Sequence, residues 1–447
     1  MIATQQGLLP VKPSSRPPPR PPRSIARVPV PPLVPKSPGT PSKTISDHVT
    51  PRALLDNICL ADEGFMQWSA LRYIAPSMPD TYDCIGKHDT LIHEIYYADL
   101  RTKCVSILTR DVLDCLAGEP IAIPNPDIPE DLSLPFKIAP SPGKGLGLFA
   151  TRFLEAGQLV VAEPPLIIVP LVLPMTSPGL SKAHTFRTLF ARLEDPHRRL
   201  LLSLSNCKPA SLCSREEGII RTNGLSIELH ATEGYTVAHN GVFLITSRAN
   251  HSCSPNAAYI WDADAFTLTL SALRPIPVDE EITIAYTSLT APLASRLFTL
   301  RAAYHFACAC ESCVRPRTDR ALLQSDQNRI ELDRWWARRT TFERWLKDRS
   351  MPYLALIIAH VRALEMLEQE GLHDGRARHC DMVARCFGAL GETNKFVEWA
   401  ARAAKEWTVV ARRYSGAVQE EIALEKVGMC KKWVREPDSF EFWATRL

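Results

Sequence analysis

The chain has 447 residues, 45% of them hydrophobic and 23% charged, and a formal net charge of +3. The length predicts two or three folded units, and the composition is that of a globular protein. No apolar run is long enough to cross a bilayer, and the near balance of charge favours no polyanionic partner. We therefore expect neither a membrane span nor direct binding to nucleic acid.

The thirteen cysteines show no regular disulfide-like spacing, and three of them fall within residues 308–313. An odd and clustered set of this kind favours a reducing compartment and a metal site over a secreted disulfide framework. We therefore expect an intracellular protein of the nucleus, the cytoplasm or both.

Residues 1–50 hold thirteen prolines and seven Lys or Arg, with no acidic residue before Asp47. Because so little apolar surface cannot offset the entropy of ordering the chain, we predict a disordered, basic tail. The proline density opposes the amphipathic helix of a mitochondrial presequence. A solvated linker is the plain interpretation, and a nuclear-import or SH3-type docking segment is the functional alternative.

Residues 51–135 form a region to which the sequence assigns no role. From Leu91 to Leu116, apolar residues recur at mostly four-residue spacing, which predicts a helix and makes the region partly helical. Four prolines between Pro120 and Pro129 then mark a linker into the next unit.

The next unit is predicted to span residues 136–290 and to begin with Phe136. Three glycines within residues 143–147 leave the backbone without side-chain cover, so a ligand could approach its N–H groups closely. Between about residues 172 and 240 the pattern weakens, and we expect an insertion that shapes a substrate groove or merely packs. The strands predicted before it are Leu159–Glu163 and Leu166–Val169, and the helices predicted within it lie near Ala183–Leu193 and Arg199–Leu204.

The most distinctive stretch is Asn-His-Ser-Cys-Ser-Pro-Asn at residues 250–256. Its Ser and Asn side chains compete for backbone hydrogen bonds and its proline disfavours a preceding helix, so we predict an ordered loop rich in donors and acceptors. Such loops commonly carry binding groups. A strand with partial alternation is predicted from Tyr259 to Leu270, and the acidic turn at Asp279 leads into a last short strand ending at Tyr286.

A predicted helix, Ala294–Tyr304, leads into a cysteine triplet with the spacing Cys-x-Cys-x-x-Cys. The spacing brings three thiolates within reach of one ion, but structural zinc takes four ligands in a tetrahedron. A fourth ligand must therefore come from elsewhere in the chain. The alternative is three reduced surface cysteines. The triplet consists of Cys308, Cys310 and Cys313.

Residues 318–447 are predicted to be a separate helical unit. Apolar stripes recur at helical spacing from Leu354 to Leu367 and from Ala400 to Ala411. Antiparallel helix pairs of this kind suggest a tetratricopeptide-like stack, although no 34-residue repeat is visible. Four tryptophans are expected in the core rather than in a ligand cage: Trp335, Trp336, Trp399 and Trp407.

Four motifs in this order resemble a SET domain over residues 136 to 315: the Gly-Leu-Gly stretch, the heptapeptide, the acidic turn with its strand to Tyr286, and the cysteine triplet of a post-SET segment, residues 291–317. The SET domain is the fold of protein lysine methyltransferases. The resemblance implies an α+β fold in which a β-rich catalytic domain of small sheets with a threaded loop precedes the helical region. SET relatives of the MYND type carry a Cys-rich zinc finger, but the insertion holds only Cys207 and Cys213, so we predict that this finger is absent.

The resemblance also implies a binding site for S-adenosylmethionine. The glycine turn would hold its amino-acid end from one side, the heptapeptide would hold it from the other, and an aromatic ring would cover the adenine. The side chain of His251 is expected to brace the fold rather than act as a base. The cofactor-binding residues implied are Lys144, Gly145, Leu146, Gly147, Asn250, His251, Tyr286 and Phe306.

Two tyrosines match catalytic positions of the family. Tyr286 would orient the substrate amine and the methyl group, and Tyr304 would line the lysine channel. The resemblance also supplies the fourth zinc ligand, since Cys253 in the heptapeptide completes the site with Cys308, Cys310 and Cys313 in similar proteins. Zinc would then tie the post-SET segment to the cofactor loop.

The function implied is S-adenosylmethionine-dependent methylation of a lysine in a protein, whether a histone tail or another protein. The alternative is a catalytically silent SET scaffold whose helical C-terminal domain binds a partner protein. A zinc-dependent nucleic-acid binder is disfavoured by the weak net charge. A glycosidase is rejected because Glu280 and Glu281 are adjacent, and neighbours on a strand face opposite ways.

Overall fold

The computed structural model describes residues 73–74, 91–97, 102–116, 134–171, 173, 181–232, 234–314, 318–414 and 418–446. Contacts divide the chain at residue 48, and every described residue belongs to the second unit, Val49–Leu447. The tail predicted for residues 1–50 and the linker predicted near Pro120–Pro129 lie outside the described residues. No helix within the described ranges is long and apolar enough to cross a membrane.

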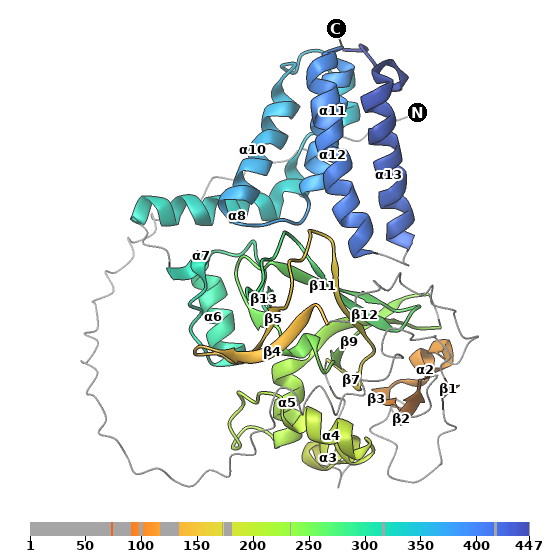
Figure 1. The fold of residues 1–447 in the computed structure, drawn as a ribbon, viewed down its shortest axis with the longest axis vertical. Helices are drawn as coiled ribbons and strands as arrows, with labels where there is room; N and C mark the ends of the chain where they lie inside the picture. Colours follow the sequence, from red (N-terminus) through yellow and green to blue (C-terminus); the bar gives the residue numbers. More distant parts are fainter. Residues whose placement is uncertain are drawn as a thin grey trace, which may run out of the picture. The chain divides into compact units, whose positions relative to one another are not determined.

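The described strands form three sheets (Figure 1). The largest has the strand order β1-β2-β3-β7-β9-β8, the second has β10-β13-β5-β4, and the third has β11-β12-β6. Their bounds are β1 Tyr73–Ile74, β2 Leu91–Tyr96, β3 Lys103–Leu108, β4 Phe136–Ser141, β5 Gly145–Ala150, β6 Leu159–Glu163, β7 Ile167–Pro170, β8 Leu225–His230, β9 Thr236–Val242, β10 Asn250–His251, β11 Ala257–Asp262, β12 Thr267–Ala272 and β13 Glu281–Ile284.

Short helices accompany the sheets, and longer helices form the C-terminal region. The shorter ones are α2 Arg110–Leu116, α3 Lys182–Ala191, α4 Asp195–Leu202, α5 Arg215–Asn223, η1 Thr246–Arg248, α6 Leu293–Tyr304 and α7 Glu311–Val314. The C-terminal ones are α8 Asp319–Arg338, α9 Phe342–Lys347, α10 Ala355–Gln369, α11 Arg376–Ala389, α12 Thr393–Arg413, α13 Val418–Arg435 and η2 Pro437–Ser439. The α+β class expected from the sequence is confirmed.

The second sheet brings three distant segments side by side. Strand β10 pairs in parallel with β13, with Asn250 opposite Thr283, and β13 pairs in antiparallel fashion with β5, with Ile282 opposite Leu148. Asn256 closes the loop after β10: its side-chain oxygen accepts the Thr283 N–H at 2.8 Å, and its amide donates to the Glu281 carbonyl at 2.8 Å. The start of the heptapeptide therefore lies directly beside the strand that leads to Tyr286.

A buried carboxylate fixes the backbone just before the heptapeptide. Glu163 on β6 is 3% exposed and accepts the backbone N–H groups of Ile245 and Thr246 at 3.0 and 2.6 Å. Burial raises the pKa of Glu163, while these hydrogen bonds act in the opposite direction. The carboxylate thus satisfies donors at the start of η1, which leads into Asn250.

One secondary-structure prediction is wrong. The described residues between Leu91 and Leu116 form β2, β3 and the short helix α2, where the sequence pattern predicted one helix. The reason is that residues four apart share a face on a strand as well as on a helix, so Cys104 and Leu108 fit both patterns. All six residues of β3 are buried, and the strand lies inside its sheet, with β2 on one side and β7 on the other.

A second prediction needs correction after the heptapeptide. The single strand expected from Tyr259 to Leu270 is a hairpin of β11 and β12. The side chain of Asp262 accepts the backbone N–H of Ala265 at 2.9 Å, and Phe266 adopts a φ of 51°. An Asp side chain bonded to the backbone ahead of it is a common turn device, and its signal here was the Asp-Ala-Asp-Ala sequence.

The other predicted elements are found, most of them with shifted ends. Strand β6 has the predicted bounds, β7 begins one residue late, α3 begins at Lys182, α4 begins four residues early, and α6 covers the predicted helix. The last strand ends at Ile284, two residues before Tyr286.

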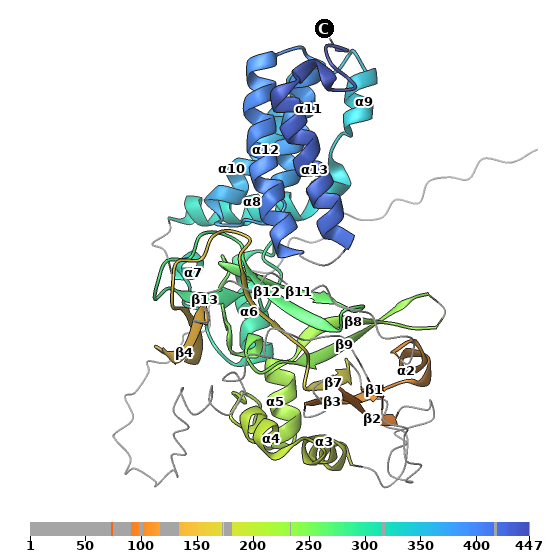
Figure 2. The same ribbon diagram turned by 45° about the vertical axis from the view of Figure 1, so that its right-hand side comes forward.

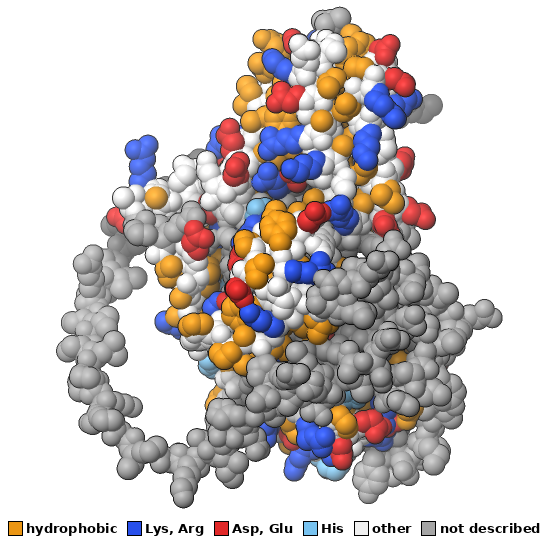
Figure 3. Space-filling view, viewed as in Figure 1, with side chains coloured by type: hydrophobic (Ala, Val, Ile, Leu, Met, Phe, Trp, Pro, Cys, Tyr) orange, Lys and Arg blue, Asp and Glu red, His pale blue; other side chains and the backbone are white. Residues whose placement is uncertain are grey.

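The C-terminal helices pair consecutively and share a core of their own. Helices α11, α12 and α13 lie side by side in both ribbon views (Figures 1 and 2). Trp335 and Trp407 are buried as expected, whereas Trp399 is partly buried with the Arg402 guanidinium over its ring; the side chain of Trp336 lies outside the described residues. Acidic, basic and apolar side chains are interspersed on the visible face of these helices (Figure 3).

A cavity of about 630 Å³ lies between α8 and α10. Its lining includes Ile330, Trp335 and Leu356 together with several arginines, among them Arg334 and Arg338. None of the residues that the sequence singles out for cofactor or metal binding lines it, so the cavity is separate from the candidate site.

A buried arginine of the helical region, which is paired with a glutamate of that region, also reaches the heptapeptide loop. Arg329 on α8 is fully buried and donates from Nε to Glu370 at 2.8 Å. Its Nη1 and Nη2 atoms lie 3.4 Å from the carbonyl oxygen of Cys253, and Nη1 also donates to the Leu289 carbonyl. A single α8 side chain thus holds the backbone at the centre of the heptapeptide.

Replacing this arginine should destabilise the protein strongly. We expect Arg329→Met to lower the free energy of unfolding by about 3–5 kcal/mol, because Glu370 is left buried without its cation. The matched control is Arg362→Met, whose pair with Glu331 is 59% and 41% exposed and should be worth at most about 1 kcal/mol. Urea unfolding followed by circular dichroism compares the two. Equal losses in both variants would contradict a special role for Arg329.

Candidate cofactor and metal site

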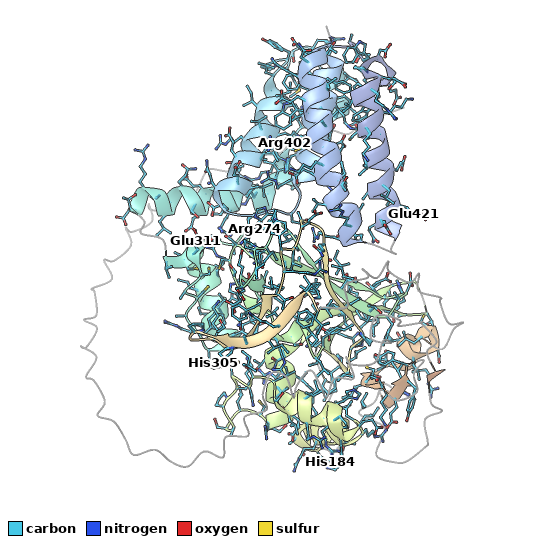
Figure 4. The ribbon with its side chains drawn as sticks, viewed as in Figure 1. His184, Arg274, His305, Glu311, Arg402 and Glu421 are labelled. Atoms are coloured by element: carbon cyan, nitrogen blue, oxygen red, sulfur yellow. The ribbon has the colours of Figure 1, made fainter. Side chains whose placement is uncertain are left out.

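Four cysteine sulfurs gather at one point. The Sγ atoms of Cys253, Cys308, Cys310 and Cys313 all lie within 4.8 Å of one another. Cys308 and Cys310 lie between α6 and α7, in the segment bracketed by His305 and Glu311 (Figure 4). The heptapeptide and the triplet, more than fifty residues apart in the chain, therefore meet as predicted.

The geometry and chemistry of this cluster fit zinc. A Zn–S distance of about 2.3 Å gives sulfur–sulfur separations of about 3.8 Å in a tetrahedron, and the Sγ atoms of Cys253 and Cys313 lie 3.6 Å apart. Cys253 and Cys308 are buried, and Cys310 and Cys313 are partly buried. Four sulfur ligands close the coordination sphere, which is typical of a structural site.

The nearby charges also fit a tetrathiolate metal centre, whose net charge is about −2. Arg296 and Arg329 are both fully buried, and burial together with the charge of Arg296 lowers the pKa of Arg329. Within the described part of the chain, Nε and Nη2 of Arg296 have no hydrogen-bond partner. Glu370 balances only one of these cations, so an additional negative charge nearby is electrostatically favourable.

Hydrogen bonds tie Cys253 and the residue after it, Ser254, to the segment that carries the cysteine triplet. The backbone N–H of Cys253 donates to Sγ of Cys310 at 3.4 Å. On the other side, the hydroxyls of Ser254 and Ser312 are hydrogen-bonded, which ties the heptapeptide to α7 a second time. Contacts of this kind orient metal ligands and hold the two segments together.

The ring of His251 links the cysteine cluster to Tyr286. The backbone N–H of Tyr286 donates to Nδ1 of His251 at 3.0 Å, so that Nδ1 is an acceptor and Nε2 carries the proton. Nε2 lies 3.3 Å from Sγ of Cys253, to which it can donate. With both ring nitrogens engaged inside the protein, His251 braces the site and has no nitrogen free to act as a base.

The Tyr286 hydroxyl is fixed and neutral. It donates to the backbone carbonyl of Ala249 at 2.7 Å. Burial, with smaller contributions from the charges of Tyr304 and Glu281, raises the pKa of the Tyr286 phenol. Because its proton is engaged and retained, the phenol can offer a ligand only the lone pairs of its oxygen.

Aromatic rings surround Tyr286. Its ring centroid lies 4.9 Å from that of Tyr304, and Phe306 lies 6.4 Å from Tyr304 and 6.2 Å from His251. The ammonium of Lys208, from the insertion, lies 5.7 Å from the centroid of Tyr304. Tyr286, Tyr304, Phe306 and His251 therefore form one aromatic wall, to which the insertion contributes a cation.

The glycine turn faces the heptapeptide across the second sheet. Asn250 donates from Nδ2 to the Leu146 carbonyl at 3.1 Å. Gly147 lies so close that a Cβ built on it would be 2.9 Å from that same Nδ2 atom. The structure thus brings Lys144 to Gly147 and Asn250 together, as the sequence predicted.

Sequence reasoning missed Glu281 as a member of this group. Its carboxylate accepts from Lys144 at 2.7 Å and from Asn250 Nδ2 at 2.8 Å. Burial favours a higher pKa for Glu281, but hydrogen bonds from Lys144, Asn250 and Ser141 outweigh burial and hold that pKa below its usual range. Glu280 instead pairs with Arg274 at 2.6 Å, so the two glutamates do face opposite ways. Strand alternation could have placed Glu281 on the side of the glycine turn.

A family model of the SET domain matches residues 145–287. Residues 145–287 form a SET domain. This range contains the glycine turn, the heptapeptide and the strand that leads to Tyr286. The cysteine triplet follows the matched residues after helix α6, and the insertion lies inside them.

Two curated relatives are similar over parts of the chain. Histone-lysine N-methyltransferase set5 of Schizosaccharomyces pombe is 30% identical over 178 residues, which cover 40% of this chain and 50% of the relative. Protein-lysine N-trimethyltransferase SMYD5 of Danio rerio is 36% identical over 91 residues, which cover 20% of this chain and 22% of the relative. The matches thus span half or less of each relative's length.

Among solved structures, Rubisco LSMT bound to AdoMet aligns with 71% of this chain and 92% of its own at 11% identity, with a TM-score of 0.26. The absence of a MYND finger stays a prediction, since neither the SET match nor the relatives test it.

We expect the four cysteines to act as one stability unit. Cys310→Ser removes one thiolate from a four-ligand set, so the zinc content should fall well below one equivalent and the melting temperature should drop. Adding a strong chelator to the unchanged protein should lower the melting temperature as well. Elemental analysis and thermal unfolding measure the two effects.

The control is Cys213→Ser, which changes a partly buried cysteine outside the cluster. It should keep both zinc content and melting temperature near those of the unchanged protein. A Cys310→Ser protein with full zinc content and an unaltered melting curve would exclude the proposed ligand set.

Proposed function

We propose that this protein is an S-adenosylmethionine-dependent methyltransferase that acts on a lysine side chain of a protein. The observation that carries the proposal is the convergence of the glycine turn, Asn250 and the neutral phenol of Tyr286 within a SET domain. S-adenosylmethionine would supply an electrophilic methyl group on its sulfonium. The substrate class follows from the activity for which the curated relatives are named, and both histone and non-histone lysines fit it.

The proposed chemistry needs positioning more than acid–base work. An ammonium has no lone pair, so the substrate amine must reach the site after losing its proton. In this proposal the Tyr286 oxygen accepts an N–H of the neutral amine and aims the nitrogen lone pair at the methyl group. The phenol of Tyr286 keeps its proton, which it donates to the Ala249 carbonyl. In this proposal Tyr286 therefore orients the substrate amine, and solvent takes the proton from the substrate ammonium.

The remaining residues keep their expected roles in the proposal. Tyr304 lines the channel next to Tyr286, and Phe306 covers the adenine from the same wall. Lys144, Gly145, Leu146 and Gly147 hold the amino-acid end opposite Asn250. Zinc at the four cysteines fixes the post-SET segment against the heptapeptide.

Calorimetry with S-adenosylmethionine, followed by transfer of labelled methyl groups to a protein extract, tests this function against the silent scaffold. Binding followed by labelling, with methyl-lysine identified by mass spectrometry, is the expected result. Binding without transfer to any extract would favour the scaffold. Nothing in the described part of the helical region, residues 318–414 and 418–446, favours the scaffold over the enzyme.

Tyr286→Phe should lower turnover on the order of 10²-fold, the effect usual for removing one preorganised hydrogen-bonding group. The affinity for S-adenosylmethionine should stay within about twofold, since ring packing against Tyr304 is retained. Turnover is measured by product formation and affinity by calorimetry. Tyr235→Phe makes the same change at an exposed phenol that bonds Asp111, and it should leave turnover unchanged. Equal turnover in both variants would refute the role given to Tyr286.

A further inference from the structure

A lysine of the insertion stands beside the aromatic wall of the proposed lysine channel. We propose that Lys208 recognises a carboxylate next to the target lysine, so that this protein prefers substrates in which an Asp or Glu lies within two residues of that lysine. The inference rests on the proposed function, because it takes Tyr304 as the lining of the channel. It narrows the substrate class and gives a role to a residue that the sequence motifs do not single out.

The loop between α4 and α5 holds Lys208 in place. The backbone N–H of Cys207 donates to Thr222 Oγ1 at 3.2 Å, and the carbonyl of Ser205 accepts from the Asn223 amide at 2.7 Å. Both partners lie on α5. The backbone directly before Lys208 is therefore anchored to a helix, so that the lysine side chain extends from a fixed point.

The same loop contacts both segments that form the candidate site. At its start, the Ser203 hydroxyl accepts from Nη2 of Arg248, two residues before the heptapeptide, at 2.8 Å. At its end, the Lys208 ammonium donates to the carbonyl of Ala303 in the last turn of α6. The loop therefore fixes the ammonium against the ring of Tyr304, 5.7 Å from the ring centroid.

Within the described part of the chain, no carboxylate pairs with Lys208. Its ammonium makes one hydrogen bond to these residues, and the acceptor is the neutral Ala303 carbonyl. Glu217 on the neighbouring helix α5 is bonded to Arg221 instead, at 3.5 Å. Because an ammonium has three N–H donors, two remain for an acceptor that a substrate brings. A carboxylate is the acceptor that also balances the charge.

The position of this charge makes it selective. The Tyr304 ring that Lys208 contacts also packs against Tyr286, with 4.9 Å between the ring centroids. A residue one or two positions from the target lysine lies within about 7 Å of it along an extended peptide, so its side chain can meet Lys208 while the lysine enters the channel. A cation at this place attracts an acidic neighbour and repels a basic one.

An oriented peptide library tests this preference. Each peptide carries one lysine at its centre, and the two positions on either side hold a random mixture of residues other than lysine. After methyl transfer from S-adenosylmethionine, mass spectrometry of the methylated peptides gives the ratio of Asp and Glu to Asn and Gln at each position. We expect this ratio to exceed that of the starting mixture about threefold at one position or more, the size usual for a partly exposed charge pair. Because all peptides compete in one reaction, the ratio does not depend on the amount of active protein.

Variants of the full chain separate the charge from the fold. Lys208→Gln keeps an N–H for the Ala303 carbonyl and removes the charge, so the enrichment should fall to about onefold. Lys208→Glu reverses the charge and should favour Arg at the same position. The control Lys182→Met removes an exposed lysine at the start of α3, in the same insertion, and should keep the preference of the unchanged protein. If Lys208→Gln does not fold, Lys208→Met decides by the same ratio.

The outcomes separate this role of Lys208 from the proposed function. A library that the unchanged protein methylates without preference, or an undiminished preference in Lys208→Gln, would overturn the role of Lys208 and leave the proposed function standing. If the protein labels a protein extract but not the library, the neighbours of the lysines labelled in the extract give the same ratio. Absence of methyl transfer to both would overturn the proposed function and this inference together.

Discussion

The arrangement of the whole site depends on Cys253. Its sulfur meets three other thiols and the His251 ring, its N–H donates to Cys310, and its carbonyl faces the Arg329 guanidinium. One residue thus joins the heptapeptide, the post-SET segment and the helical region. Because every polar group of Cys253 is engaged, displacing it leaves several buried groups unsatisfied at once, and this is costly. The position of Tyr286 also depends on Cys253, because the His251 ring contacts the Cys253 sulfur and accepts the Tyr286 N–H.

This dependence changes how the helical region is understood. Its consecutive helices with their own core suggest an independent module, yet Arg329 and Glu370 reach the centre of the SET domain. Ser254 also donates to the Glu370 carbonyl at 2.7 Å. Since buried ionic contacts of this kind are costly to break, the orientation of α8 and the shape of the heptapeptide loop are coupled. The cavity beside α8 lies next to this contact along the same helix.

The features that could be predicted from the sequence are those that a local residue pattern or the order of the motifs determines. The strand Leu159–Glu163, the helix to Tyr304 and the meeting of Cys253 with the triplet were found as expected. The prediction of a helix over Leu91–Leu116 was wrong because a four-residue spacing of apolar residues fits a strand as well as a helix. Only the pairing of β3 with β2 and β7 decides between the two. Glu281 and Arg329 were missed because their partners lie 137 and 76 residues away in the chain, beyond any local pattern.

Register explains why so short a strand as β10 matters. Asn250 lies opposite Thr283 and His251 opposite Ile284, a pairing that Asn256 locks through the Thr283 N–H. A slip of one residue on β13 would reverse every side chain. It would turn Glu280, now held by Arg274, toward the glycine turn and would carry Glu281 away from Lys144. It would also separate the Tyr286 N–H from His251, so that the sulfur cluster and the phenol would lose their connection. A two-residue strand can hold this register because Asn256 fixes the end of the loop and the cysteine cluster fixes its middle.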